Sequence, residues 1–544
     1  MTHHFNGGIL NIESRGIAIP AAVLAIAAIA SRLLGVLRDW LLAERFGAGA
    51  DLDIYFAAFR VPDFIYNILV FGGITVAFLP LFSEYYAKNK QEAWRFANNT
   101  LNVFFFFLSV LCILLFIFTP QLVAMIAPGF SADQLAKTAH LSRLMFLSPI
   151  IFGVSSIFSG ILQYFRRFLA YSLAALLYNA GIIAGIIFLA PAMGITGVGI
   201  GVILGALLYL LIQVAPAVQC GFAYRPVFDL KARSLYRVYG LMLPRTAGIA
   251  ANQLNLIAPT IIASSLATGS ITIFNLANNI YSLPVGIIGV SYATAAFAAF
   301  SQLYSENRVA ELAAKFSETY RQIGYLTIPA AVLLFILSRP VVEVLYFHGQ
   351  FSQEAAGLAA ATLKVFCLGI YFAAVMPAIF RLFFSLRDTA TPTLTTVFSV
   401  LVNVVLNYVF VAMLAEGELA SWARRIFALG GAVDIGVMGL ALAFGVANAL
   451  QFAMLALFLY RKDPALVRLK EIASSFLIAA GAGILMALAV YLVSGLTGRG
   501  GFVWQVAGII ASSAVGGIVY LSATLLMGSP EAIGLKQTLL RRFK

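Results

Sequence analysis

Charged residues are scarce in this sequence of 544 residues, of which only 10% are Asp, Glu, Lys or Arg. Hydrophobic residues make up 62% of the chain, and the mean hydropathy is +0.95. A soluble domain does not have this balance, because its surface needs many more polar side chains. The composition therefore predicts a membrane protein.

Cysteine and histidine are also rare, with three and four residues. Cys112, Cys220 and Cys367 lie in or beside apolar segments and lack metal-ligand spacing, so we expect no disulfide bond and no metal centre built from them. A P-loop lysine motif, a nucleophile constellation and a metal-binding histidine pair are missing as well. We therefore expect neither an enzyme nor ATP-driven transport within this chain.

Long apolar runs predict an all-α polytopic membrane protein with about fourteen transmembrane helices. The first run has no basic start and no small-residue cleavage site, which predicts a retained helix rather than a signal peptide. The fourteen segments lie near residues 17–45, 53–84, 97–127, 140–165, 171–191, 194–219, 238–266, 271–303, 322–347, 358–385, 392–414, 436–460, 470–495 and 502–527.

The distribution of positive charge predicts the orientation. With both termini in the cytoplasm, 23 Lys and Arg residues fall in cytoplasmic loops and 7 in outer loops. The positive-inside rule selects this arrangement, and it assigns the net charge of +13 to the loops rather than to nucleic-acid binding.

Two short motifs recur in the same order in the two halves of the chain. Gly194-Ile195-Thr196-Gly197 resembles Gly436-Val437-Met438-Gly439, and Phe82-Ser83 resembles Phe300-Ser301. Six helices per repeat predict two pseudosymmetric six-helix lobes around a central cavity, plus two C-terminal helices. An insertion near 415–434 forms either an amphipathic helix on the outer face or a plain loop. The predicted domains are an N-terminal cytoplasmic segment (1–16), an N-lobe (17–220), a cytoplasmic linker (221–237), a C-lobe (238–462), the last two helices (463–528) and a basic tail (529–544).

Arg32 lies deep in the first apolar run, about 22 Å along a helix that starts at Ile17. A charge in hydrocarbon costs roughly 2.5–3.5 kcal/mol on insertion scales, so Arg32 either snorkels to the far surface or faces a partner or a wet pathway. We favour the pathway.

Further polar residues follow Arg32 at a spacing of seven, which returns to nearly the same helix face. The related sets are Ser31 and Arg38, Arg32 and Asp39, and the stripe Asp53, Arg60 and Asn67. Interleaved Arg and Asp on these adjacent helices would offset each other's desolvation and leave donors for an anion. Alternatively, Arg38, Asp39 and Asp53 lie at the outer interface. The predicted spans hold five positive charges and three negative ones, which favours an anionic substrate.

Segments seven, eight and eleven carry a second group of polar residues. Their amides either join helices or line a cavity. Asn403 and Asn407 share a face of segment eleven, and with Asn252 and Asn255 they form a candidate Na⁺ site, although they offer no carboxylate. The other members are Arg245, Gln253, Asn275, Asn278, Asn279 and Ser282.

Several of these motifs resemble the MurJ/MviN family of lipid II flippases, within the multidrug/oligosaccharidyl-lipid/polysaccharide exporter superfamily. The resemblance runs in order over nearly the whole chain. It rests on Ser31-Arg32-Leu33-Leu34-Gly35-Val36-Leu37-Arg38-Asp39, Arg45-Phe46-Gly47-Ala48-Gly49, the stretch from Asp53 to Pro62, Ala127-Pro128-Gly129-Phe130, Gly349-Gln350-Phe351, Arg387-Asp388 and Thr391-Pro392.

The resemblance implies a bacterial plasma-membrane or inner-membrane protein that moves a lipid-linked cell-wall precursor to the outer face by alternating access. In this family, arginines of helices one, two and eight bind the diphosphate, and Arg32, Arg38, Asp39 and Asp53 match such positions. Arg60 and Arg245 are the candidates to replace family arginines that this sequence lacks. The predicted substrate site is Ser31, Arg32, Arg38, Asp39, Asp53, Arg60, Arg245 and Asn279. The sequence departs from the family pattern at Tyr66 or Asn67 and at Asn279, where arginines are expected. Asn407 stands where an acid would favour Na⁺.

Three other functions are compatible with the sequence. The chain could export another polyprenyl-diphosphate-linked saccharide or a drug, or act as a cell-wall scaffold that does not transport. The embedded positive charges disfavour a cationic drug. We expect a monomer whose partners are the undecaprenyl-diphosphate-type lipid and membrane lipid, without nucleic acid and with no cofactor except Na⁺ at the site above.

Overall fold

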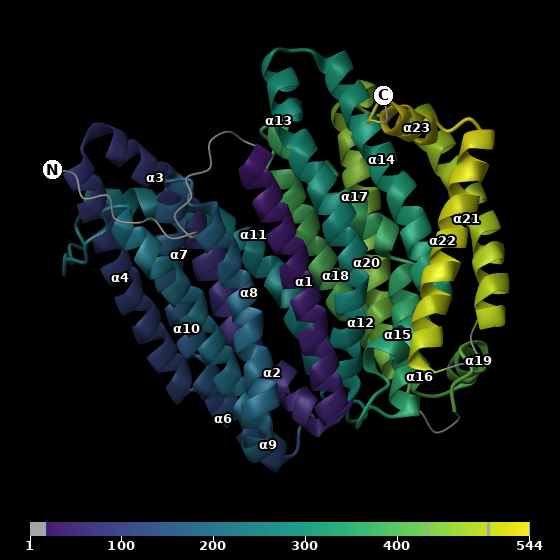
Figure 1. Cartoon of the computed structure of the whole chain (residues 1–544), viewed down its shortest axis with the longest axis horizontal. Coiled ribbons are helices and arrows are strands. Elements are labelled where there is room, and N and C mark those ends of the chain that lie inside the picture. The colour runs from purple at the N-terminus through teal and green to yellow at the C-terminus, as the bar shows by residue number, and fades with distance from the viewer. Residues whose placement is uncertain (1–17, 431–433, 498–500, 543–544) are drawn as a thin grey trace. The chain divides into compact units, whose positions relative to one another are not determined.

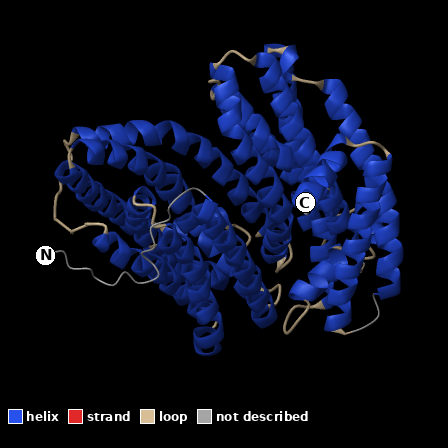
Figure 2. Cartoon of the chain, turned by 45° about the horizontal axis from the view of Figure 1, so that its top comes forward, coloured by secondary structure: helices blue, strands red, loops and turns tan. Residues whose placement is uncertain are grey.

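The computed structural model describes residues 18–430, 434–497 and 501–542, and in this part of the chain it contains helices and loops but no strand (Figure 2). In hydrocarbon a helix satisfies every backbone polar group within its own segment. The predicted all-α membrane fold is confirmed. The chain divides into two compact units, Met1–Gly269 and Ser270–Lys544.

The first unit is built from the first ten α-helices of the chain, and one more helix, α11, joins them (Figure 1). In chain order its elements are α1 (Ala18–Phe46), α2 (Ala50–Ile65), η2 (Tyr66–Ile74), α3 (Thr75–Lys88), α4 (Lys90–Ile117), α5 (Thr119–Ile126), α6 (Ala132–Met145), α7 (Leu147–Tyr164), α8 (Phe168–Ala184), η3 (Gly185–Leu189), α9 (Ala190–Met193), α10 (Ile195–Gln219) and α11 (Arg233–Ala263).

Helix α10 packs between α7 and α8, and α1 lies along α8. Glycines allow the α8 and α10 backbones to approach closely. A Cβ on Gly201 would lie 2.8 Å from the Cα of Gly185, and a Cβ on Gly205 would collide with the carbonyl oxygen of Tyr178. Small residues permit this packing where lipid tails provide no hydrophobic drive for helix association.

Helix α11 packs against η2, α3, α5 and α2, so contacts place it in the first unit. The division between units therefore falls after Gly269, beyond the predicted linker at 221–237. That linker is held on α4 by side-chain amides. Asn98 and Asn99 each accept a hydrogen bond from a linker N–H and donate one to a linker carbonyl.

The second unit contains the remaining helices. Helix α18 packs along α20, α14 contacts α17 and α21, and α21 packs on α22. Its elements are α12 (Ser270–Pro284), η4 (Val285–Val290), α13 (Ser291–Ser305), α14 (Val309–Ile336), α15 (Ser338–Tyr346), α16 (Gln353–Cys367), α17 (Ile370–Ser385), α18 (Ala390–Ala415), α19 (Glu418–Ile426), α20 (Gly436–Lys462), η5 (Pro464–Leu466), α21 (Leu469–Thr497), α22 (Phe502–Leu526) and α23 (Pro530–Arg542).

The order of helices repeats. The series α4, α5, α6 and α7 has the same order and similar lengths as α14, α15, α16 and α17. A π-helical segment follows both α2 and α12, as η2 and η4. Ser131 caps α6 and Ser352, 221 residues later, caps α16 through the same side-chain hydrogen bond to the backbone. The weak sequence repeat therefore corresponds to a structural one.

Nine helices of the described residues are long and apolar enough to span a membrane, or eleven if two bent pairs each count as one span. The predicted count of fourteen is not confirmed. The three predicted segments outside this set, near 17–45, 53–84 and 238–266, are those that carry the embedded Arg and Asp residues.

The insertion near 415–434 contains the amphipathic helix α19, so a helix rather than a plain loop is confirmed, and its place on the outer face stays a prediction. Ala420 and Ala423 are buried, whereas Leu419, Trp422 and Ile426 are exposed on one face. A short helix with an apolar stripe and basic residues is suited to a membrane surface.

Candidate functional site

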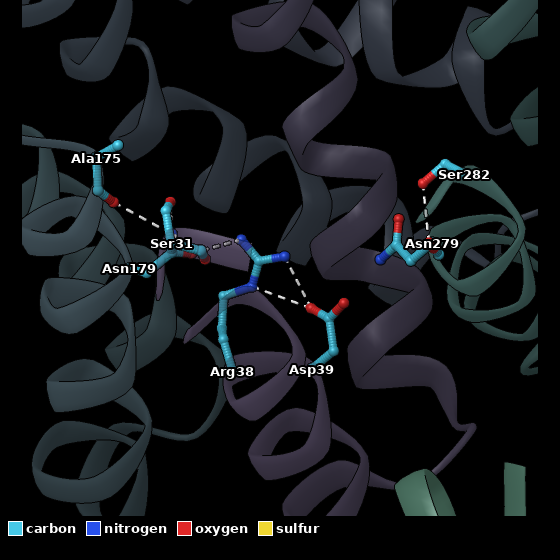
Figure 3. Close-up of polar contacts among 7 residues, drawn as sticks. All are labelled: Ser31, Arg38, Asp39, Ala175, Asn179, Asn279 and Ser282. Atoms are coloured by element: carbon cyan, nitrogen blue, oxygen red, sulfur yellow. Dashed lines mark hydrogen bonds and ion pairs between the residues drawn. The ribbon is translucent and has the colours of Figure 1, made fainter. Parts of the chain in front are cut away.

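A network of polar side chains joins α1 to α8. The Arg38 Nε and Nη2 atoms donate hydrogen bonds of 3.0 and 2.8 Å to Asp39 Oδ1 (Figure 3). The Asp39 side chain is 6% exposed and that of Arg38 24%. A charge-assisted pair of this kind neutralises the arginine in a largely buried position, where an unpaired charge is costly.

Asn179 of α8 completes this network. Its Oδ1 accepts a 3.4 Å hydrogen bond from Arg38 Nη1, and its Nδ2 donates to Ser31 Oγ at 3.3 Å. Ser31 and Arg38 therefore share the face of α1 that the seven-residue spacing predicts. The packing of α1 along α8 places the amide between them.

Arg32 lies on an exposed part of α1, beside Ile29 (61% exposed) and Leu33 (66% exposed). Within the described residues it forms no ion pair. Arg32 and Arg38 are thus in different environments. Arg38 is held by protein partners, whereas the guanidinium of Arg32 retains its donors for a ligand or for the polar edge of the membrane.

A second polar seam joins α2 to α11. Arg60 Nε donates a 2.7 Å hydrogen bond to Thr260 Oγ1. One turn after Arg60, the Asp63 carboxylate interacts with the Arg60 charge and hydrogen-bonds the side chain of Gln253. These contacts hold α11 on the first unit and give Arg60 a protein partner.

Asp53 lies near the start of α2, where its Oδ2 accepts a 2.6 Å hydrogen bond from the backbone N–H of Gly269. Gly269 has φ +94°, and a Cβ there would collide with the carbonyl oxygen of Ala48. Asp53 therefore fixes the segment after α11 against the turn between α1 and α2, which is a structural role.

Two predicted site residues, Arg245 and Asn252, have side chains outside the described residues, although their backbones belong to α11. Asn279 lies on α12 in the second unit, where its carbonyl oxygen accepts a 2.8 Å hydrogen bond from Ser282 Oγ (Figure 3). This contact involves the backbone of Asn279 and does not test its side chain, so the substrate role of Asn279 stays a prediction.

The four residues of the predicted Na⁺ site belong to different units: Asn252 and Asn255 to the first, and Asn403 and Asn407 to the second. Asn403 and Asn407 are fully buried on α18, and Asn407 Nδ2 donates to Asn403 Oδ1 at 3.0 Å. Asn403 Nδ2 and Asn407 Oδ1 are left without a partner, as is Asn255 Oδ1 on α11. The described residues contain no group of three or more His, Cys, Asp and Glu that could hold a metal.

In the second unit, Asp388 lies in the turn between α17 and α18. Its carboxylate accepts hydrogen bonds from the Thr391 N–H and from Lys462 Nζ, at 3.0 and 2.6 Å. Burial would raise the pKa of Asp388, but these hydrogen bonds outweigh it and lower the pKa below its usual value. These contacts give Asp388 and Thr391 of the motif a structural role.

The sequence reasoning missed Asn179 and Thr260, which bind the side chains of Arg38 and Arg60. Asn179 is the only side-chain amide between residues 164 and 212. An amide isolated in an apolar run is a usable signal, because it needs a partner at membrane depth. A threonine in a helix usually bonds to its own backbone and gives no such signal.

Comparison with known proteins identifies relatives over most of the chain. The model of the family "Lipid II flippase MurJ" matches residues 42–511. A probable lipid II flippase MurJ from Buchnera aphidicola is 27% identical over 94% of this chain and 97% of its own length. Another, from Rhizobium meliloti, is 30% identical over 74% of this chain and 76% of its own length.

Solved structures show the same fold. A lipid II flippase MurJ in an inward closed conformation has a TM-score of 0.74 and 23% identity, and the match covers 93% of this chain and 98% of that one. A multidrug resistance MATE family transporter of the MOP superfamily, in an inward-facing conformation, has a TM-score of 0.67 and 14% identity over 82% of this chain and 98% of its own.

Proposed function

The chain belongs to the MurJ family of lipid II flippases, and on this premise we propose that it moves lipid II from the cytoplasmic to the outer face of the membrane by alternating access. The observation that carries the proposal is the family match over residues 42–511 of an all-helical, multi-pass membrane protein. The function is transport of a lipid-linked cell-wall precursor rather than catalysis.

In this function, Arg32 binds the diphosphate of the lipid directly. Arg38 positions the neighbouring face of α1 through its contacts with Asp39 and Asn179. The support is the contrast between their surroundings, because Arg38 is neutralised by Asp39 whereas Arg32 is exposed and forms no ion pair in the described residues. A guanidinium offers a planar fork of donors that fits phosphate oxygens, which an ammonium does not.

Substitution of Arg32 tests this role in cells depleted of their own lipid II flippase. Arg32→Ala should abolish growth and Arg32→Lys should impair it strongly, at protein levels matched by immunoblot. Leu33→Ala, an exposed neighbour without charge, serves as the control and should support growth. Full rescue by Arg32→Ala would reject diphosphate binding and favour a scaffold that does not transport.

The orientation places both termini in the cytoplasm and α19 outside. Support comes from the distribution of Lys and Arg between loops. A cysteine at Ser421 of α19 should react with an impermeant thiol reagent in intact cells, whereas a cysteine at Lys231 should react only after lysis. Both positions are exposed in the structure. The opposite labelling pattern would reverse the orientation.

Na⁺ coupling at Asn403 and Asn407 is a separate part of the proposal. Asn403 and Asn407 are buried and retain unused polar atoms, which supports a bound polar species, but they supply no negative charge. If Na⁺ binds there, transport into vesicles should depend on Na⁺ and Asn403→Ala should remove that dependence. Transport that ignores Na⁺ in the unsubstituted protein would eliminate the site.

A further inference from the structure

Two cations occupy corresponding positions in the two repeats. Arg143 lies near the end of α6 and Lys364, 221 residues later, near the end of α16. Each lies over a phenylalanine that is the penultimate residue of the preceding long helix. Arg143 Cζ is 5.1 Å from the ring of Phe116, and Lys364 Nζ is 6.0 Å from that of Phe335.

Among the described residues, no carboxylate lies within ion-pair distance of Arg143 or Lys364. Arg143 uses one donor, because its Nε donates a 3.2 Å hydrogen bond to the carbonyl oxygen of Phe116. In the part of the chain that the structure describes, the remaining guanidinium donors and the ammonium of Lys364 form no hydrogen bond. By contrast, Lys137 on α6 forms a 2.7 Å ion pair with Asp133.

Each cation lines a cavity. Arg143 borders an apolar cavity of about 660 Å³ between α4, α6 and α7, lined by Cys112, Ile113 and Leu147, with His140 at the same wall. Lys364 borders a smaller cavity of about 190 Å³, which extends along α16 past Gly357 to Glu354. Arg339 also lines this cavity, and its charge repels that of Lys364.

The surfaces around both cavities are suited to lipid. On α4, Ile113 is 60% and Ile117 58% exposed, so the apolar cavity opens beside an apolar helix face. Beside the second cavity, Phe427 contacts Lys364 at 6.0 Å, and the adjoining helix α19 exposes Trp422 (61%). Aromatic and apolar side chains next to unpaired cations are typical of the membrane–water interface.

We propose that Arg143 and Lys364 each bind the phosphate of an anionic phospholipid, one molecule per repeat. The leaflet is the outer one in the orientation proposed above, and the site does not depend on the transported substrate. At Arg143 the apolar cavity takes part of an acyl chain while the guanidinium binds the phosphate. At Lys364 the ammonium and Arg339 bind the phosphate, and Glu354 accepts a hydrogen bond from the headgroup.

Native mass spectrometry of the detergent-purified protein tests this proposal. We expect two molecules of palmitoyl-oleoyl phosphatidylglycerol to bind more tightly than phosphatidylcholine with the same acyl chains. Arg143→Gln and Lys364→Gln should each weaken one of the two binding steps about tenfold, and the double variant should lose both. Lys137→Gln, which removes an exposed and already paired charge from α6, should keep both steps.

A soluble headgroup separates lipid binding from simple anion binding. Glycerol phosphate carries the same phosphate without acyl chains, so it should not displace the lipid at Arg143, where the apolar cavity contributes. Displacement of both lipids by glycerol phosphate would reduce the sites to anion binding and overturn the proposal. Retention of both lipids by the double variant, or equal loss in Lys137→Gln, would also overturn it.

Discussion

Removing the carboxylate of Asp39 should destabilise the first unit because it leaves Arg38 buried without its counter-charge. In Asp39→Ala, Arg38 loses both hydrogen bonds to Oδ1, at 3.0 and 2.8 Å. Among its hydrogen bonds to the described residues, only the 3.4 Å contact with Asn179 is left. Solvent compensates little, since only 24% of the Arg38 side chain is exposed.

The free energy of unfolding should fall by about 3–5 kcal/mol, which is the range for removing one partner of a buried ion pair. Each kilocalorie lowers the midpoint of thermal unfolding by about 2 °C in large domains, so the midpoint should fall by about 6–10 °C. The measurement is thermal unfolding of the purified protein in one detergent. Substitution of Lys137, whose ion pair with Asp133 is exposed, should shift the midpoint by less than about 2 °C.

A double variant separates stability from function. Arg38→Met together with Asp39→Ala removes both charges, so most of the lost stability should return. Growth should not return, because the face of α1 beside Arg32 has then lost the group that positions it. A double variant as unstable as Asp39→Ala would refute the argument that an unpaired cation causes the loss. One that supports normal growth would show that Arg38 is dispensable.

Three further predictions follow from the packing and from the loop contacts. Gly205→Ala should cost about 1–3 kcal/mol, because the new Cβ collides with a backbone carbonyl of α8, whereas Gly517→Ala, with open space around it, should be neutral in the same thermal assay. Asn99→Ala should speed protease cleavage within residues 221–237, since it removes a pair of hydrogen bonds that is worth about 1–3 kcal/mol. Asp388→Asn should unfold at a lower temperature than the unsubstituted protein near neutral pH. Because contacts including that with Lys462 lower the pKa of Asp388, its contribution is complete above the unfolded pKa of 3.8 and is lost as the pH falls through the lower folded value. The difference between the two proteins should therefore narrow in acid, and a difference independent of pH would contradict it.

The helical membrane fold and the repeat are predictable because both depend on local patterns in the sequence. A long apolar run fixes a spanning helix whatever surrounds it, and the shared glycine-bearing helix starts of α10 and α20 reveal the repeat. The number of membrane spans is harder to predict. The segments that contain Arg32, Arg60 and Arg245 mix apolar residues with charges, so they fall outside the set of helices whose length and hydropathy identify a span.

Partners of the buried arginines are less predictable because they depend on which helices become neighbours. The seven-residue spacing places Ser31 and Arg38 on one face, but the residue that binds both, Asn179, comes from α8, more than 140 residues later. Similarly, Asp53 belongs to a predicted charge stripe, yet its carboxylate binds a backbone N–H of a distant loop. The sequence of one helix therefore shows which of its faces is polar, but it does not show which residue of another helix binds to that face.

The two repeats differ at the interface where the candidate Na⁺ ligands lie. Helices α8 and α18 start 222 residues apart, so Gly181 and Gly185 correspond to Asn403 and Asn407. In the first repeat these glycines bring the end of α8 and the start of η3 against the α10 backbone. In the second, two buried amides fill the equivalent positions and bond to each other, with Asn403 Nδ2 and Asn407 Oδ1 left unused. Burying amides where glycines pack well costs free energy unless they acquire partners. The asymmetry is therefore a reason to look for a bound polar species between α18 and α20, whether or not that species is Na⁺.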